Sequence, residues 1–187
     1  RTDARTQMGD PLHSEPVLIT YGGTDAAPDI SIFLGPNEGG IHAVSATDGT
    51  EQFMFIPKDM LANQDRFYSN GGSYQTRPYG MDGPLTTWVK DLNGNLQLGD
   101  PGDFAYLFAG MRMGGRNYYA LDVTNRNAPK LRWVIRGGGA LSNPYRELGQ
   151  TWSRAVVAKI KLNATNRDVL IFTGGYDQKQ DDEVLPT

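Results

Sequence analysis

Cysteine is absent from this chain of 187 residues. Without a thiol the chain has no disulfide, no thiolate ligand for zinc and no cysteine nucleophile. Histidine is scarce too, because His13 and His42 are the only two and stand far apart in the sequence. A histidine zinc site or a Ser-His-Asp triad therefore has little to be built from. These absences argue against the common hydrolases and zinc enzymes.

A surplus of positive charge is also missing. The formal net charge is −3, so no basic excess exists to neutralise phosphates, and nucleic acid is not expected as a partner. No apolar run approaches the roughly 20 residues that cross a bilayer, so no transmembrane segment is expected in this chain. The first residues lack the basic and then apolar pattern of a leader. Both ends resemble cuts through a longer protein, so this does not assign the chain to the cytoplasm.

Glycine and proline, by contrast, are plentiful, with 23 and 11 residues. Such turn-formers are typical of all-β folds, and short β-rich runs lie between them. A first group of strands is expected at 16–21, 29–34, 41–45 and 52–56, a second at 85–90, 104–109, 117–123 and 130–135, and the start of a third at 153–160 and 168–173. A few helical turns are expected over 58–63.

The groups of strands repeat one another in detail. Gly39-Gly40 matches Gly114-Gly115, and the run 42–45 matches 119–122. The period is about 70–78 residues, longer than the roughly 40–50 of common propeller repeats, because insertions lengthen it. Repeated four-stranded antiparallel units are typical of propeller blades, which need neighbours on both faces. We predict an all-β fold, a partial β-propeller of about two and a half four-stranded antiparallel blades cut from a larger propeller; an eight-stranded β-sandwich is the alternative.

The repeat also predicts the division of the chain. A lead-in segment at 1–11 precedes an incomplete propeller domain at 12–187, which holds a blade at 12–57, an inter-blade insertion at 58–77, a blade at 78–136, a loop at 137–149 and the start of a third blade at 150–187. The insertion is either a loop that contacts a partner or one that covers a blade edge. Its candidate contact residues are Arg66, Phe67, Tyr68, Tyr74 and Tyr79.

Two groups of oxygen-bearing side chains are candidate metal sites. Alternate oxygen ligands in a tight loop suit Ca²⁺, although glycine falls at loop position four and position twelve is Gly102. A solvated Asn-Gly turn or acidic run is the other interpretation of each group. The loop candidates are Asp91, Asn93, Asn95, Gln97, Asp100 and Asp103, and the acidic cluster is Asp177, Asp181, Asp182 and Glu183. Calcium is the one cofactor that these residues suggest.

Several aromatic side chains fall in or beside the expected strands: Trp88, Trp133, Trp152, Tyr118 and Tyr119. A sugar-binding surface is one interpretation of this set. Packing between stacked blades is the interpretation that we favour, because bulky rings fill the space between sheets.

Five stretches, at 9–16, 32–44 with 53–57, 110–124, 148–154 and 173–182, occur in the order of motifs in a known family. The most specific is Gly-Met-Arg-Met-Gly-Gly-Arg-Asn-Tyr-Tyr-Ala-Leu-Asp-Val-Thr at 110–124. Together they resemble the C-terminal propeller of PilY/PilC-type proteins, the type IV pilus tip family. The resemblance runs over essentially the whole chain.

The resemblance implies a quinoprotein-like propeller that is exported, passing through the periplasm to the outer membrane, cell surface or pilus tip. It implies an adhesin and pilus biogenesis factor that supports pilus assembly, surface attachment and twitching motility. The implied partners are minor pilins of the pilus tip complex, host or abiotic surfaces, and the remaining blades of the same propeller. Family members use a calcium loop rich in Asp and Asn, which the resemblance does not assign to named residues here.

Two alternatives to the adhesin stay open. The wider superfamily includes pyrroloquinoline-quinone dehydrogenases, so a propeller dehydrogenase is one of them. An outer-membrane propeller that acts as an assembly scaffold is the other. Since the chain lacks cysteine and any evident cofactor constellation, we expect no enzyme activity. Bound quinone would favour the dehydrogenase, and association with minor pilins would favour the adhesin.

Overall fold

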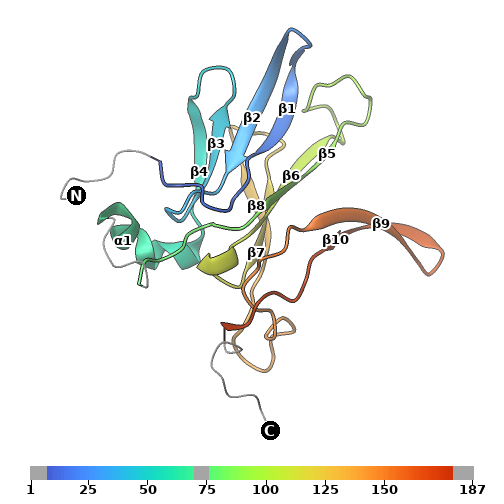
Figure 1. Cartoon of the computed structure of the whole chain (residues 1–187). Coiled ribbons are helices and arrows are strands. Elements are labelled where there is room, and N and C mark those ends of the chain that lie inside the picture. Colours follow the sequence, from blue (N-terminus) through green and yellow to red (C-terminus); the bar gives the residue numbers. More distant parts are fainter. Residues whose placement is uncertain (1–7, 70–75, 179–187) are drawn as a thin grey trace.

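The computed structural model describes residues 8–69 and 76–178, which form three antiparallel sheets (Figure 1). Each of the first two sheets has four strands paired in sequence order. The strands are β1 (Val17–Thr24), β2 (Ala27–Leu34), β3 (Ile41–Ser45) and β4 (Glu51–Phe55), then β5 (Leu85–Lys90), β6 (Phe104–Gly110), β7 (Tyr118–Asp122) and β8 (Lys130–Ile135), and finally the pair β9 (Val156–Leu162) and β10 (Thr165–Ile171). The predicted all-β fold of repeated four-stranded antiparallel units is confirmed.

A short helical insertion follows the first sheet. The helical turns expected over 58–63 are the 3₁₀-helix η1 (Lys58–Asn63), and the chain continues as α1 (Gln64–Ser69). Met60 and Phe67 are buried, and Asp59 accepts a hydrogen bond from the Tyr119 hydroxyl at 2.8 Å. The insertion therefore packs against both four-stranded sheets rather than extending into solvent.

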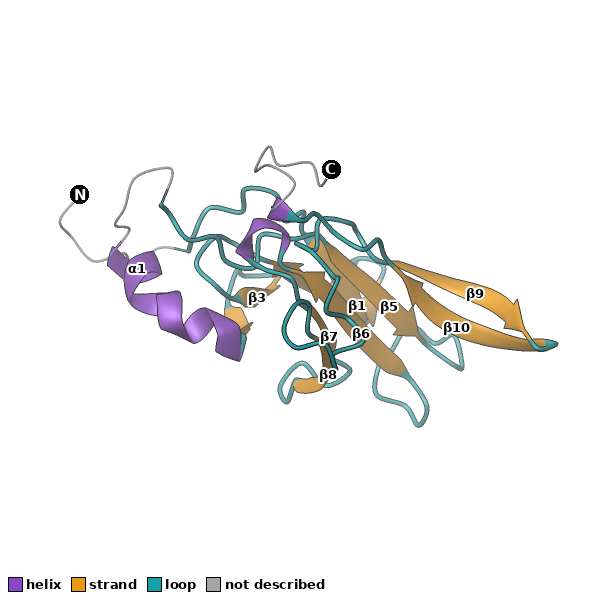
Figure 2. Cartoon of the chain, turned by 90° about the horizontal axis from the view of Figure 1, so that it is seen from below, coloured by secondary structure: helices purple, strands orange, loops and turns teal. Residues whose placement is uncertain are grey.

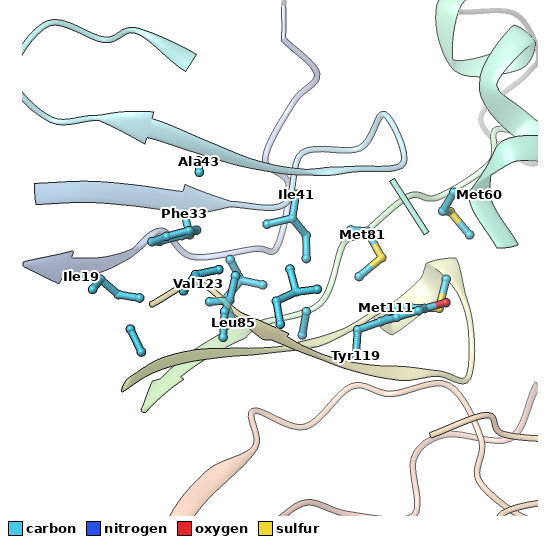
Figure 3. Close-up of a cluster of buried hydrophobic side chains, with 14 of the residues drawn as sticks. Ile19, Phe33, Ile41, Ala43, Met60, Met81, Leu85, Met111, Tyr119 and Val123 are labelled. Carbon is cyan, nitrogen blue, oxygen red and sulfur yellow. The ribbon is translucent and has the colours of Figure 1, made fainter. Parts of the chain in front are cut away.

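A single hydrophobic cluster lies between the first two sheets (Figure 3). Phe33 of β2 and Leu107 of β6 are fully buried in it, and Tyr119 of β7 is 2% exposed. Alternate residues of each strand face this layer, as the two-residue period of a strand requires. Burying one such side chain contributes about 1.5–3 kcal/mol. Because the two sheets share the cluster, the inner face of each is buried by the other.

Backbone hydrogen bonds join the segments before the first and third sheets to the β2–β3 turn and the β6–β7 connection, respectively. The Asn37 amide donates to the Asp10 carbonyl at 2.9 Å, and the Arg112 amide donates to the Thr151 carbonyl at 3.2 Å. Gly114, in the short 3₁₀-helix η2 (Arg112–Gly114), approaches the carbonyl oxygen of Gly80 so closely that an added Cβ would lie 1.8 Å from it. The paired glycines seen in the sequence thus allow close backbone contact with the segment before β5, since a Cβ on Gly80 would in turn lie 2.4 Å from the Gly39 nitrogen in the first unit.

The hairpin of β9 and β10 extends away from the other sheets (Figure 2). Its two-residue turn places Asn163 and Ala164 at φ of 48° and 62°, in the left-handed region. A groove of about 210 Å³ lies between this hairpin and the second sheet. Trp133 lines the groove and stacks on Phe108 of the same sheet, with ring centroids 5.8 Å apart. Tyr118 of β7 packs against Phe172, just after β10, with ring centroids 4.3 Å apart, which is the packing between units that was expected for the aromatic residues.

Candidate functional site

The 91–103 loop connects β5 to β6 and carries the first predicted metal site. Asp91 accepts the amides of Gly94 at 2.8 Å and Leu96 at 2.7 Å through its two carboxylate oxygens. Gly94 and Leu96 both have left-handed backbones, with φ of 69° and 60°. For Leu96, at loop position six, this conformation is uncommon because it lacks glycine's freedom. The loop is thus wound tightly around the Asp91 carboxylate.

The other polar side chains of the loop bond to one another. Asp100 accepts the amide groups of Asn93 at 2.7 Å and Asn95 at 2.9 Å. Asp103 accepts the backbone amides of Leu92 and Asp100. The structure therefore gathers Asn93, Asn95, Asp100 and Asp103 into one exposed network beside Asp91. The described residues contain no group of three or more histidine or acidic side chains arranged to hold a metal, so a cation here would also need amide or backbone oxygens.

Gln97, the sixth predicted ligand, points instead toward the first sheet. Its side-chain amide donates to the Gly23 carbonyl at 3.3 Å, and its Oε1 occupies the space that a Cβ on Gly22 would take. The Leu98 amide donates to the Tyr21 carbonyl at 3.0 Å. The loop therefore joins the second sheet to the β-bulge of β1, a connection that the sequence did not predict.

A polar cavity of about 470 Å³ adjoins this junction. On its wall Arg126 forms a two-pronged ion pair with Asp29, with N–O distances of 2.6 and 2.5 Å, and its guanidinium lies 4.8 Å from the Tyr21 ring centroid. The hydrogen bond from Arg126 holds the pKa of Asp29 below its ordinary value. Burial raises the pKa of the Tyr21 hydroxyl, which donates to the Val123 carbonyl at 2.6 Å. The charges of Arg126 and Asp29 thus neutralise each other where the first two sheets meet.

A buried carboxylate lies in the segment that leads into β5. Asp82 is fully buried and contacts His13 Nδ1 with both oxygens, at 2.9 and 2.8 Å. Arg112 donates to the same carboxylate at 3.2 Å and lies 4.2 Å from the ring centroid of Trp152. The three segments that meet here are the lead-in to the first sheet, the lead-in to the second and the β6–β7 connection. Arg112 and His13 lie 30 and 69 positions from Asp82 in the sequence, and no sequence signal pairs them with it.

The predicted partner-contact residues are not all exposed. Phe67 is 5% exposed and packs in the core, whereas Tyr68 is 60% exposed. Arg66 donates to the Thr76 carbonyl, and Tyr79 is partly buried. Tyr74 lies outside the described residues. Tyr68 and Arg66 are therefore the two members of this set that the structure places on an exposed surface.

The second predicted acidic cluster is described at one position. Asp177 forms an ion pair with Arg116 at 3.4 Å, with both side chains partly exposed. Asp181, Asp182 and Glu183 lie outside the described residues. The pairing of Asp177 is that of a surface ion pair, which contributes about 0–1 kcal/mol.

No helix within 8–69 and 76–178 is long and apolar enough to cross a membrane.

The chain is similar in sequence to known proteins from two bacterial species. No family model matches the chain. The type IV pilus biogenesis factor PilY1 of Pseudomonas aeruginosa (strain UCBPP-PA14) is 25% identical over 198 residues, covering 95% of this chain and 16% of the relative. A PilY1 homolog of Xylella fastidiosa (strain Temecula1) is 30% identical over 199 residues, covering 88% of this chain and 13% of the relative.

A solved structure resembles the fold as well. The crystal structure of the P. aeruginosa PilY1 C-terminal domain superposes with a TM-score of 0.50 and 26% sequence identity, covering 74% of this chain and 24% of that chain. The chain spans 13 to 16% of the length of the two curated relatives described above. The similarity thus concerns one part of a much longer type of protein.

Proposed function

Because the chain belongs to the PilY1-type family, we propose that it forms part of the C-terminal propeller of a type IV pilus biogenesis factor. What supports the proposal is a sequence similarity of 25 to 30% that runs over 88 to 95% of the chain, joined to a matching fold. In this role the chain contributes to pilus assembly from the cell envelope. The full protein is exported and reaches the cell surface or pilus tip.

The finer role that we propose is non-catalytic: an adhesin whose propeller is a scaffold for surface attachment and twitching motility. Paired charges support a scaffold, since the buried Asp82 is ion-paired with Arg112 and hydrogen-bonded to His13, and Arg126 is ion-paired with Asp29. The proposed partners are minor pilins of the tip complex and host or abiotic surfaces. The remaining blades of the same propeller would cover β10, whose neighbour in the described residues is β9 alone.

The test is deletion of the gene that encodes this sequence in its native host. Loss of surface pili, restored by the full-length gene, is the expected result, together with labelling of the sheared pilus fraction by an antibody against this chain. Normal piliation with a signal confined to the periplasm would contradict the proposal. Quinone in the purified full-length protein would then favour the dehydrogenase alternative.

We also propose that the 91–103 loop binds calcium. The chemistry of the donors fits, because Asp91, Asp100 and Asp103 supply hard carboxylate oxygens. The amide oxygens of Asn93 and Asn95 accept the backbone amides of Asn95 and Gln97, and each keeps a second lone pair for an ion. The left-handed backbone of Leu96 at loop position six supports the proposal, since calcium loops of the EF-hand type require a sharp turn there. A bound ion would neutralise the carboxylates and stiffen the connection to β1.

Replacing Asp91 by asparagine is expected to weaken calcium binding at least about tenfold, because a charged ligand of the ion is lost. Isothermal titration calorimetry of the chain with calcium chloride measures this. Asp48→Asn is the matched control, since Asp48 likewise accepts a backbone amide in an exposed turn, that of Thr50 at 3.0 Å. Equal affinities for the two variants, or no binding by the unmodified chain, would refute the calcium site without touching the pilus role.

A further inference from the structure

The imidazole of His42 lies between two carboxylates in the first sheet. His42 is 5% exposed. Its Nδ1 contacts Oε2 of Glu51 on β4 at 2.6 Å, and its Nε2 contacts Oε1 of Glu38 in the β2–β3 turn. A neutral imidazole has one N–H and one lone pair, so it can donate to one carboxylate only. The arrangement is satisfied on both sides when the ring is an imidazolium.

The surroundings favour that charged form. Burial acts to lower the pKa of His42, but the hydrogen bonds and charges of Glu38 and Glu51 outweigh burial and raise the pKa above the ordinary 6.5. The strand neighbours paired with His42 are Leu34 of β2 and Met54 of β4, which carry no charge. Glu38 and Glu51 are thus the titratable groups of the described residues that act on this ring.

Glu38 is also hydrogen-bonded to two other segments. Its second oxygen, Oε2, accepts the Gly9 amide of the lead-in segment at 2.7 Å. Its backbone carbonyl accepts the side-chain amide of Gln64, the first residue of α1, at 3.4 Å. The next residue back, Asn37, is bonded to Asp10 as described above. The β2–β3 turn is therefore the point where the lead-in segment, the helical insertion and His42 meet.

We propose that His42, Glu38 and Glu51 form a pH-sensitive clasp that holds β4, the lead-in segment and the helical insertion to the β2–β3 turn. As an imidazolium, His42 donates to both carboxylates. When the ring loses a proton, one of its nitrogens presents a lone pair to a carboxylate. Glu51, whose side chain is 53% exposed, then turns to water, while Glu38, at 16%, remains but loses the charge assistance of its bond.

The clasp is closed at a pH below the folded-state pKa of His42, while Glu38 and Glu51 are ionised, and it loosens at a pH above that pKa. A histidine with a raised pKa in the folded state contributes stability that is fully present below the unfolded pKa of about 6.5 and is lost as the pH rises through the folded pKa. The insertion that is loosened carries Arg66 and Tyr68, the exposed members of the predicted partner-contact set. That consequence for partner contact rests on the proposed function, whereas the clasp itself does not.

Nuclear magnetic resonance of the unmodified chain tests the clasp directly. The His42 ring is expected to titrate above pH 6.5, and the chemical shift of the Gly9 amide is expected to follow the same curve. Titration of His42 at or below pH 6.5 would overturn the proposal. So would a chemical shift of the Gly9 amide that does not follow the His42 titration curve. Neither result depends on pilus assembly, so failure of the clasp and failure of the proposed function are distinguishable.

Two variants sharpen the test. Glu51→Gln removes one carboxylate and is expected to shift the titration of His42 to lower pH without unfolding the chain, because Glu51 is half exposed. His42→Gln donates to Glu38 but cannot titrate, so the change in the Gly9 shift over the pH range in which His42 titrates is expected to vanish. A Gly9 shift that still changes over that range in His42→Gln would show that a group other than His42 drives it and would refute the clasp.

Discussion

Gly114→Ala is expected to destabilise the chain by about 3 kcal/mol, since an overpacked site of this kind has no side chain that can yield. The new Cβ would lie 1.8 Å from the Gly80 carbonyl oxygen and 3.0 Å from that of Tyr79. Both contacts are with backbone, so two segments must separate. That movement would also strain the hydrogen bond from the Gly80 amide to the Asn37 side chain, 2.7 Å long. Urea unfolding followed by circular dichroism measures the loss.

Gly174→Ala is the matched control for this experiment. A Cβ on Gly174 meets nothing within 4 Å, and its backbone does not lie in the left-handed region. The control is expected to change the free energy of unfolding by less than about 0.5 kcal/mol. If both alanine variants lost the same stability, close backbone approach at Gly114 would not be the cause.

Arg112→Ala is expected to cost about 2–4 kcal/mol of folding free energy. The substitution leaves the fully buried Asp82 with His13 as its remaining partner, and breaking one side of a buried ion pair typically costs 3–5 kcal/mol. The loss is smaller here because His13 still pairs. The stacking of the guanidinium on Trp152 is lost too, which adds about 0.5–1 kcal/mol and should alter tryptophan fluorescence.

Arg146→Ala is the control for the loss of an arginine. Arg146 pairs with Glu147, whose side chain is 85% exposed. Surface pairs of this kind contribute about 0–1 kcal/mol, so the control is expected to unfold at nearly the urea concentration of the unmodified chain. A larger effect at Arg146 than at Arg112 would mean that burial of Asp82 does not set the energy of its ion pairs.

The strands were predictable where glycine or proline marked their ends. The bounds of β3, β5 and β8 agree with the predicted 41–45, 85–90 and 130–135. The third sheet was placed less well, because 153–160 and 168–173 were predicted and the strands are β9 and β10 at 156–162 and 165–171. Their turn is Asn163-Ala164, which adopts left-handed angles without glycine and so gives no turn signal.

The helix α1 was not predicted, for a different reason. Six residues are too few for a helix to be stable alone, so its stability comes from packing. Phe67 supplies that packing by entering the core shared by the two sheets. A sequence pattern records local propensity, whereas this helix depends on residues that are distant in the chain.

The candidate sites differ in the same way, between those built from neighbouring residues and those built from residues far apart in the chain. The 91–103 loop is local, and the sequence predicted which of its oxygen-bearing residues would lie together, apart from Gln97. The pairs of Asp29 with Arg126 and of Asp82 with His13 join residues 97 and 69 positions apart. Without the fold, nothing in the sequence couples them. The clasp around His42 was predictable in part. The sequence indicated that His42 lies in a strand, but it did not indicate that Glu38 and Glu51 lie on the two sides of its ring.

The core shared by the first two sheets has a consequence for the order of events during synthesis. Phe33 and Ile41 emerge early, but the residues that cover them, such as Leu107 and Val123, emerge much later. At 5–20 residues per second this delay is on the order of several seconds. During that interval the first sheet exposes an apolar face, so binding by a chaperone or delayed collapse would precede stable folding. Within residues 8–69 and 76–178, the smallest unit expected to resist proteolysis is therefore the pair of sheets.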